Sequence, residues 1–177
     1  MILYWTTTEE FGSRIIRWGR KEDCSHFAVN FFEAAGPMSL VVDSRLSSGV
    51  DCTWRETFLE KNKVLHALHW GLTHAEEMEI YVEVVHALGG AKYDKEAVFG
   101  LGASVLIERT LGVRDKFYQW DNPHRFFCVE VFKALRPLLA AKGLEFEGRL
   151  DNMTPHEFYE KLVGKAPLVD VSQHYVR

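Results

Sequence analysis

The order of strand-like and helical segments along the sequence constrains the fold more than any other feature of this chain. Short runs rich in β-branched and aromatic residues dominate the first 70 residues, and helical signals dominate after residue 73. Strands that come early and helices that come late indicate the α+β class, in which the helices are segregated from the sheet.

The strand-like runs are apolar and are separated by turn residues. Residues 25–32 and 39–46 are joined through Ala-Ala-Gly-Pro, and we expect them to form a hairpin or two adjacent strands. Further short elements are expected at residues 2–6 and 63–70 as strands, and at residues 8–19 and 54–61 as helices.

Capping signals mark the later helices. Thr73 and Glu76 have the spacing of a capping box and open a helix that we expect to run to about Leu88. Thr154 followed by Pro155 predicts the N-terminus of a short final helix. Two more helices are expected, one over residues 95–111 and one within residues 123–142 that stops at Gly143.

Length and composition are those of an ordinary globular domain. The chain has 177 residues, of which 47% are hydrophobic and 26% are charged. A chain of this length is long enough to bury a real core, so we expect a single domain over residues 1–177. Nothing in the sequence indicates an oligomeric state.

Charge and hydropathy exclude several function classes. A net charge of −4 gives no support for binding to nucleic acid. No stretch approaches the roughly 20 apolar residues of a membrane-spanning helix, and the acidic N-terminal segment does not read as a signal peptide. Three cysteines without a framework spacing indicate reduced thiols. We therefore expect a cytoplasmic protein with no stable membrane insertion.

His26 is the first candidate for acid–base chemistry. On a strand over residues 25–32, His26 shares one face with Ala28 and Asn30, and the small Ala28 leaves room for a group to approach the imidazole. His26 is either a structural histidine at the edge of the core or a general base, a role that suits histidine near neutral pH.

Asp43 stands near the end of the next strand candidate. It is either a solvated carboxylate, or it accepts the far ring N–H of His26 and fixes the tautomer, as the third member of a catalytic triad does. Because the two strands are neighbours in the sequence and are expected to pair, a contact between Asp43 and His26 is geometrically easy.

Cys128 lies in the helically spaced stretch "HRFFCVEVFKAL". It is either a small hydrophobic residue of a core helix or a nucleophile at the start of that helix. If Asn122 and Pro123 cap the helix, Cys128 lies in the second turn and gains little from the terminus. If they form a separate turn and the next residues are extended, Cys128 enters in the first turn, where backbone amides favour a thiolate and an oxyanion.

A zinc site is the competing interpretation. The side chains with suitable ligand atoms are His66, His69 and His74 with Cys52 or Cys24, and also His124 with Cys128. None of these sets has a closed ligand spacing, and His66 and His69 are expected to face opposite sides of a strand. The chain also has no phosphate-binding loop motif. We therefore expect no metal and no cofactor.

The order of these motifs resembles that of the circularly permuted papain-like cysteine hydrolases, relatives of the NlpC-type peptidoglycan peptidases. The resemblance spans roughly residues 1–140. It is carried by Ser25-His26-Phe27-Ala28-Val29, by the strand that ends near Asp43, by Gly90-Ala91-Lys92-Tyr93-Asp94 and by Cys128-Val129-Glu130.

The resemblance implies a circularly permuted papain-like (NlpC-type) α+β fold, with a small antiparallel sheet packed against helices. It also implies Cys128 as the nucleophile, His26 as the general base and Asp43 as the third triad member. Asp43 stands where the family usually has glutamate, Val129 replaces a serine, and valine is commoner at the position of Phe27. Residues 143–177 have no counterpart in the family and are expected to be a C-terminal extension.

The activity implied by the resemblance is thiol hydrolysis of an amide bond through an acyl-enzyme. A peptide or a peptidoglycan stem is the first expected substrate, and an acyl ester or thioester of a lipid is the second. The alternative is a non-catalytic binding or assembly module on the same fold, because a fold does not establish an activity.

Overall fold

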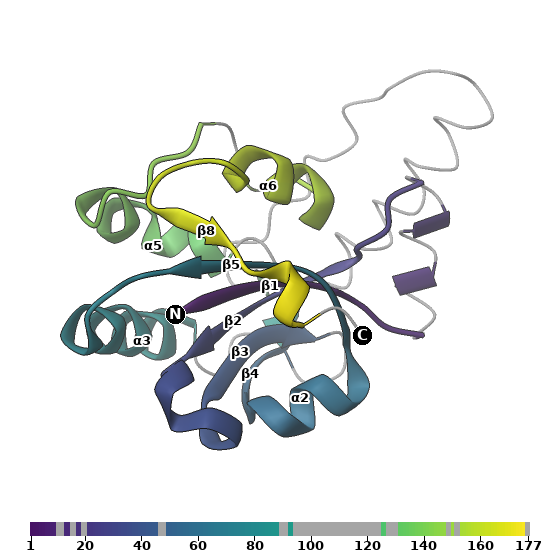
Figure 1. Cartoon of the computed structure of the whole chain (residues 1–177), viewed down its shortest axis with the longest axis horizontal. Helices are drawn as coiled ribbons and strands as arrows, with labels where there is room; N and C mark the ends of the chain where they lie inside the picture. The colour runs from purple at the N-terminus through teal and green to yellow at the C-terminus, as the bar shows by residue number, and fades with distance from the viewer. Residues whose placement is uncertain are drawn as a thin grey trace.

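The computed structural model has an α+β architecture, with a sheet that lies between layers of helix (Figure 1). It describes residues 1–9, 13–14, 17–18, 21–45, 49–88, 92–93, 125–126, 131–147, 150 and 153–175. The helix expected over residues 95–111 lies outside the described residues, as does half of the helix expected over 8–19.

The six-stranded sheet has the order β4-β3-β2-β1-β5-β8, and every neighbouring pair in it is antiparallel. Its strands are β1 Ile2–Thr7, β2 His26–Phe31, β3 Leu40–Arg45, β4 Gly49–Trp54, β5 Lys63–Trp70 and β8 Leu168–Asp170. The strands expected over residues 2–6, 25–32, 39–46 and 63–70 are confirmed. β4 and β8 were not predicted.

The pleat of the sheet sends alternate side chains to opposite faces. The face that carries Trp5 and Phe27, here called the α6 face, forms the larger hydrophobic cluster with residues of α3, α5 and α6. The face that carries Tyr4 and Ala28, here called the α2 face, packs against Phe58 of α2. Both faces are therefore buried, and the site residues must be assigned to one face or the other.

The described helices are α2 Arg55–Lys61, α3 His74–Leu88, α5 Val131–Ala141 and α6 Pro155–Leu162. Two short 3-10 helices are η1 Glu33–Met38 and η4 Ser172–His174. A second, parallel pair of strands joins β6 Lys92–Tyr93 to β7 Arg125–Phe126. Within the described residues, no helix has the length and apolar character needed to cross a membrane.

The expected helix ends are confirmed where they are described. The carboxylate of Glu76 accepts hydrogen bonds from the backbone N–H and the hydroxyl of Thr73, directly before α3. Thr154 and Glu157 form a complete capping box at the start of α6. α5 ends before Gly143, whose φ of 83° lies in the left-handed region that glycine adopts without strain.

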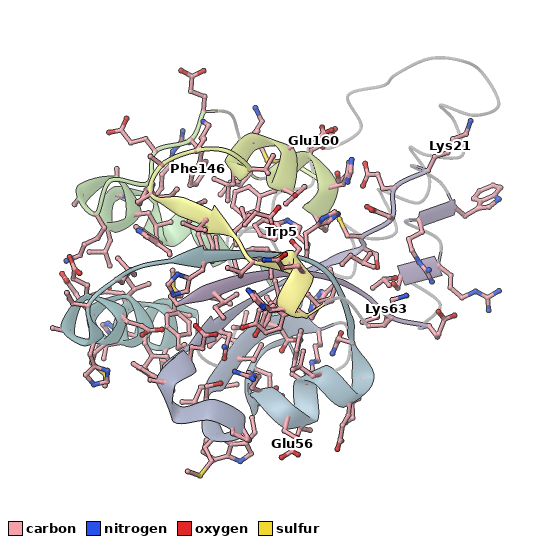
Figure 2. The ribbon with its side chains drawn as sticks, in the orientation of Figure 1. Trp5, Lys21, Glu56, Lys63, Phe146 and Glu160 are labelled. Carbon is pink, nitrogen blue, oxygen red and sulfur yellow. The ribbon has the colours of Figure 1, made fainter. Side chains whose placement is uncertain are left out.

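The C-terminal segment belongs to the main sheet and core. β8 pairs with β5 as the sixth strand, through partners such as Trp70 and Leu168. Phe158 of α6 is fully buried, with ring contacts to Trp5 and Phe27 on the sheet. Figure 2 shows Trp5 between the sheet and α6. The described part of residues 143–177 therefore contributes a strand to the sheet and a helix to the core.

Candidate active site

His26 and Asp43 lie side by side on neighbouring strands. The register of β2 and β3 pairs Ala28 with Asp43, and His26 precedes Ala28 by two residues on the same face. Both side chains therefore project to the α2 face. His26 Nε2 lies 3.1 Å from Asp43 Oδ2, which is hydrogen-bonding distance. The expected contact is present, and its catalytic role stays a prediction.

Asp43 is shared between two basic partners. Its side chain is 1% exposed, and its Oδ2 also accepts a hydrogen bond from Arg45 Nε at 2.7 Å. The guanidinium carbon of Arg45 lies 5.9 Å from the ring centroid of Phe58, on α2. A buried carboxylate needs such partners because an uncompensated charge in the interior is costly. Sequence reasoning missed Arg45, although its two-residue spacing from Asp43 places it on the same face.

The atoms in contact define what the imidazole can do. When Nε2–H of His26 donates to Asp43, the neutral ring carries its basic lone pair on Nδ1. Nδ1 is then the nitrogen that accepts a proton from a nucleophile, and the carboxylate stabilises the imidazolium that forms. His26 is the first residue of β2 and keeps 15% of its side-chain surface exposed, so it lies at the rim of the sheet.

Cys128 lies outside the described residues, between β7 and α5 in the sequence. The described residues nevertheless exclude a helix that starts at Pro123, because Arg125–Phe126 is a strand and α5 is described from Val131. α5 packs on the α6 face, where Phe132 meets Phe27 with ring centroids 5.1 Å apart. His26 points to the opposite face of the sheet.

The other two thiols have different environments. Cys24 is fully buried in the larger cluster, and Cys52 is exposed on β4. Partial desolvation raises the pKa of Cys52, as do the nearby Asp51 and Asp43 carboxylates, against an opposing contact with the Tyr81 hydroxyl. A raised pKa leaves little thiolate at neutral pH, and the thiolate is the reactive form. Neither environment is that of an activated nucleophile.

The histidines of the zinc alternative are not brought together. His66 stacks on Tyr159, with ring centroids 4.0 Å apart, on the α6 face. His69 Nε2 lies 3.7 Å from Glu33. The ring of His74 instead lies 5.5 Å from that of Phe32. His124 and Cys128 lie outside the described residues. The set His66, His69 and His74 therefore does not form a metal site.

A groove of about 760 Å³ lies beside α2, at the same end of the sheet as His26. Thr7 lines it, and the preceding residue, Thr6, is the strand partner of His26. Charged side chains of both signs, including Arg55 and Glu60 from α2, contribute to its walls. His26 and Asp43 are not among its lining residues, so the groove borders the pair without containing it.

Comparison of the chain with models of known protein families gives no match, and comparison with curated proteins gives none either. The permuted papain-like fold and the thiol chemistry therefore stay predictions.

Proposed function

We propose that this protein is a thiol hydrolase in which Cys128 is the nucleophile, His26 is the general base and Asp43 orients the imidazole. The observation that carries the proposal is the 3.1 Å contact between His26 Nε2 and the buried Asp43 carboxylate. This contact leaves Nδ1 as the basic nitrogen of the neutral ring, and the general base of a Cys-His-Asp triad needs such a nitrogen.

The proposed reaction has two stages. His26 Nδ1 takes the proton of the Cys128 thiol, and the thiolate attacks the carbonyl carbon of an amide. Backbone N–H groups at the start of the helix bind the oxyanion of the tetrahedral intermediate. The intermediate collapses as His26 protonates the leaving amine, which leaves a thioester. His26 then activates a water molecule, and hydrolysis of the thioester releases the acid and restores the thiol.

The proposed substrate is a peptide or a peptidoglycan stem, with an acyl ester or thioester of a lipid as the second class. The groove beside α2 supports a substrate with polar groups. Two lysines and two glutamates line it: Lys61, Lys63, Glu56 and Glu60. The lysines can pair with the carboxylate of a zwitterionic peptide and the glutamates with its ammonium group. A long acyl chain needs a predominantly apolar channel, which these side chains do not provide.

A structural role for the same residues is the rival account, and two observations favour it. Arg45 shares Asp43 Oδ2 with His26, which makes the three side chains a closed ionic cluster of the kind that stabilises a buried strand end. Phe132 also places α5 on the face opposite to His26. On this account the protein is a binding or assembly module, and removal of Cys128 has no effect on any turnover.

The experiment that separates these accounts is a screen of the purified full chain against peptide amides, muropeptides and acyl esters. We expect release of an amine or a free acid by the unaltered protein. Cys128→Ala should abolish the release, and Asp43→Asn should slow it by about 10²-fold or more. Cys52→Ser is the matched control and should leave the rate unchanged.

Each outcome of the screen decides one question. Turnover that needs Cys128 and His26 supports the triad, and the substrate that reacts fastest assigns the class. Turnover that survives Cys128→Ala would overturn the assignment of the nucleophile. No turnover on any of the three substrate classes, by a folded protein, would favour the binding module.

A further inference from the structure

A second cluster of titratable side chains lies on the α6 face of the sheet, opposite to the face that carries His26 and Asp43. It joins the segment that leads into β2 to the first turn of α6, 132 residues later in the sequence. Asp23 and Cys24 come from the segment before β2, and His156 is the second residue of α6. The Thr154 hydroxyl donates a hydrogen bond of 3.0 Å to Glu22, which holds the two segments together.

The candidate ligand atoms of Asp23, Cys24 and His156 lie close together. One atom from each residue lies within 4.8 Å of the other two. His156 Nδ1 is 3.2 Å from Asp23 Oδ1, close to the separation of about 3.3 Å expected between nitrogen and oxygen ligands of tetrahedral zinc. Despite this distance, the buried Nδ1 makes no hydrogen bond. Nδ1 therefore still has the capacity to bind a further partner beside Asp23.

Carboxylate and histidine neighbours surround the cluster in the way that supports metal ligands. The second carboxylate oxygen of Asp23 lies 3.3 Å from His66 Nε2. The second ring nitrogen of His156 lies 3.6 Å from Glu160, one helical turn further along α6. Metal-binding histidines characteristically direct their other nitrogen to a carboxylate, and ligating carboxylates accept a further hydrogen bond. Figure 2 shows Glu160 on α6.

We propose that Asp23, Cys24 and His156 bind one Zn²⁺ ion. A thiolate, an imidazole nitrogen and a carboxylate oxygen are zinc ligands, whereas Mg²⁺ and Ca²⁺ prefer oxygen alone. Water completes the tetrahedron as the fourth ligand. The Cys24 thiol loses its proton to solvent when the metal binds, so zinc affinity falls as the pH is lowered.

The proposed ion would tie α6 to the start of β2. Cys24 precedes His26 by two residues, so a metal at this point fixes the entry of the strand that carries the proposed base. The ligands come from two distant segments, and none has a spacing that sequence motifs recognise. This is why the sequence led to the expectation of no metal.

The test is zinc binding by the full chain, measured without reference to activity. The protein is stripped with a chelator and dialysed against Zn²⁺, and bound metal is measured by elemental analysis. Co²⁺ is then substituted to look for the charge-transfer absorption of a cobalt–thiolate bond. We expect one zinc per chain and the thiolate band. His156→Asn and Cys24→Ser should each weaken zinc binding at least 10-fold, and Glu160→Gln should weaken it roughly 10-fold.

Matched controls keep the result interpretable. Cys52→Ser and His69→Ala remove a thiol and an imidazole outside the cluster and should leave zinc binding unchanged. His156 is partly exposed, so His156→Asn is expected to fold, and circular dichroism checks this. A stoichiometry well below one, no thiolate band, or equal losses in the Cys52→Ser control would overturn the proposal. All of these results are independent of whether Cys128 is a nucleophile.

Discussion

At the scale of single residues, the account depends on one buried carboxylate. Asp43 holds both His26 and Arg45 through the same oxygen, while its Oδ1 and Arg45 Nη2 are buried with no hydrogen-bond partner. Buried polar atoms without partners are rare in folded proteins and mark either stored strain or a functional site. The cluster is therefore more than a solvated ion pair at a strand end.

Loss of Arg45 should be strongly destabilising. Arg45→Met leaves Asp43 buried with His26 as its remaining partner, so we expect the free energy of unfolding to fall by about 3 kcal/mol. Asp43→Asn in the same chain removes the uncompensated charge and should recover most of that loss. Urea unfolding of the single and double variants measures both effects.

The control for the Arg45 variant is a cation in an exposed pair. Lys142 Nζ lies 2.6 Å from Glu79, which is 51% exposed, so Lys142→Met should lower the free energy of unfolding far less than Arg45→Met does. If Arg45→Met cost as little as Lys142→Met, the buried cluster would not contribute to stability as described.

At the scale of elements, the local patterns and the pairing of neighbouring strands were predictable, and the pairings between distant segments were not. The capping residues of α3 and α6 act within one turn, so Thr73 and Thr154 identified both helix starts. The contact between His26 and Asp43 followed from two adjacent strands with alternating side chains. Both predictions needed only short-range geometry.

The two strands that were not predicted, β4 and β8, lack a local apolar pattern. β4 carries the polar residues Asp51 and Thr53 on one face, so its apolar pattern is incomplete. β8 has only three residues, and two of them, Val169 and Asp170, are exposed. Such a strand is defined by its pairing with β5, and that pairing is a long-range contact.

The end of β8 carries a pH-dependent contact. Hydrogen bonds from the Ser172 hydroxyl, and then from the Ser172 backbone N–H, lower the pKa of Asp170 below its usual value. Because the pKa is lowered in the folded state, this stabilisation is fully present above the unfolded-state pKa of about 3.9. It is lost as the pH falls through the folded-state pKa.

Asp170→Asn should therefore destabilise the protein in a pH-dependent way. At pH 7 we expect a loss of no more than about 1 kcal/mol, because Asp170 is exposed to solvent. The difference in the free energy of unfolding between this variant and the unaltered chain should become smaller as the pH is lowered from about 5 to about 2. Urea unfolding at several pH values measures this difference. Ser172→Ala should remove most of this pH dependence, and a difference that stayed constant with pH would contradict the assignment.

At the scale of the whole molecule, the C-terminal segment is part of the core. We expected residues 143–177 to be a C-terminal extension, because the family that the sequence resembles has no counterpart to them. In the structure, Phe158 of this segment packs on the sheet through ring contacts with Trp5 and Phe27. These contacts join residues far apart in the sequence, so no local pattern predicts them. The same packing of α6 on the sheet forms the cluster of Asp23, Cys24 and His156.

Truncation of Phe158 tests this integration. Phe158 is fully buried and also contacts Phe132 and Phe146, so Phe158→Ala should reduce the free energy of unfolding by about 3–5 kcal/mol. Val169→Ala on exposed β8 is the control and should change it by less than about 0.5 kcal/mol. A loss below about 1 kcal/mol for Phe158→Ala, in chemical denaturation, would mean that the segment packs independently of the sheet.

The central claim is that one of three thiols is activated by His26. The other two serve as internal standards, because Cys24 is fully buried and the pKa of Cys52 is raised by desolvation and by nearby carboxylates. A thiol paired with an imidazolium stays a thiolate well below the ordinary pKa of about 8.5, so its reaction rate depends little on pH near neutrality.

The most direct measurement is the rate of iodoacetamide alkylation at each cysteine of the folded chain, from pH 5.5 to 9, by peptide mass spectrometry. The account predicts that Cys128 reacts fastest at neutral pH and that its rate is already near its plateau there. Cys52 should react slowly until the pH is raised. His26→Ala should return Cys128 to the pH dependence of an ordinary thiol. If Cys128 reacted no faster than Cys52, or if His26→Ala left its pH profile unchanged, the thiol hydrolase account would be wrong.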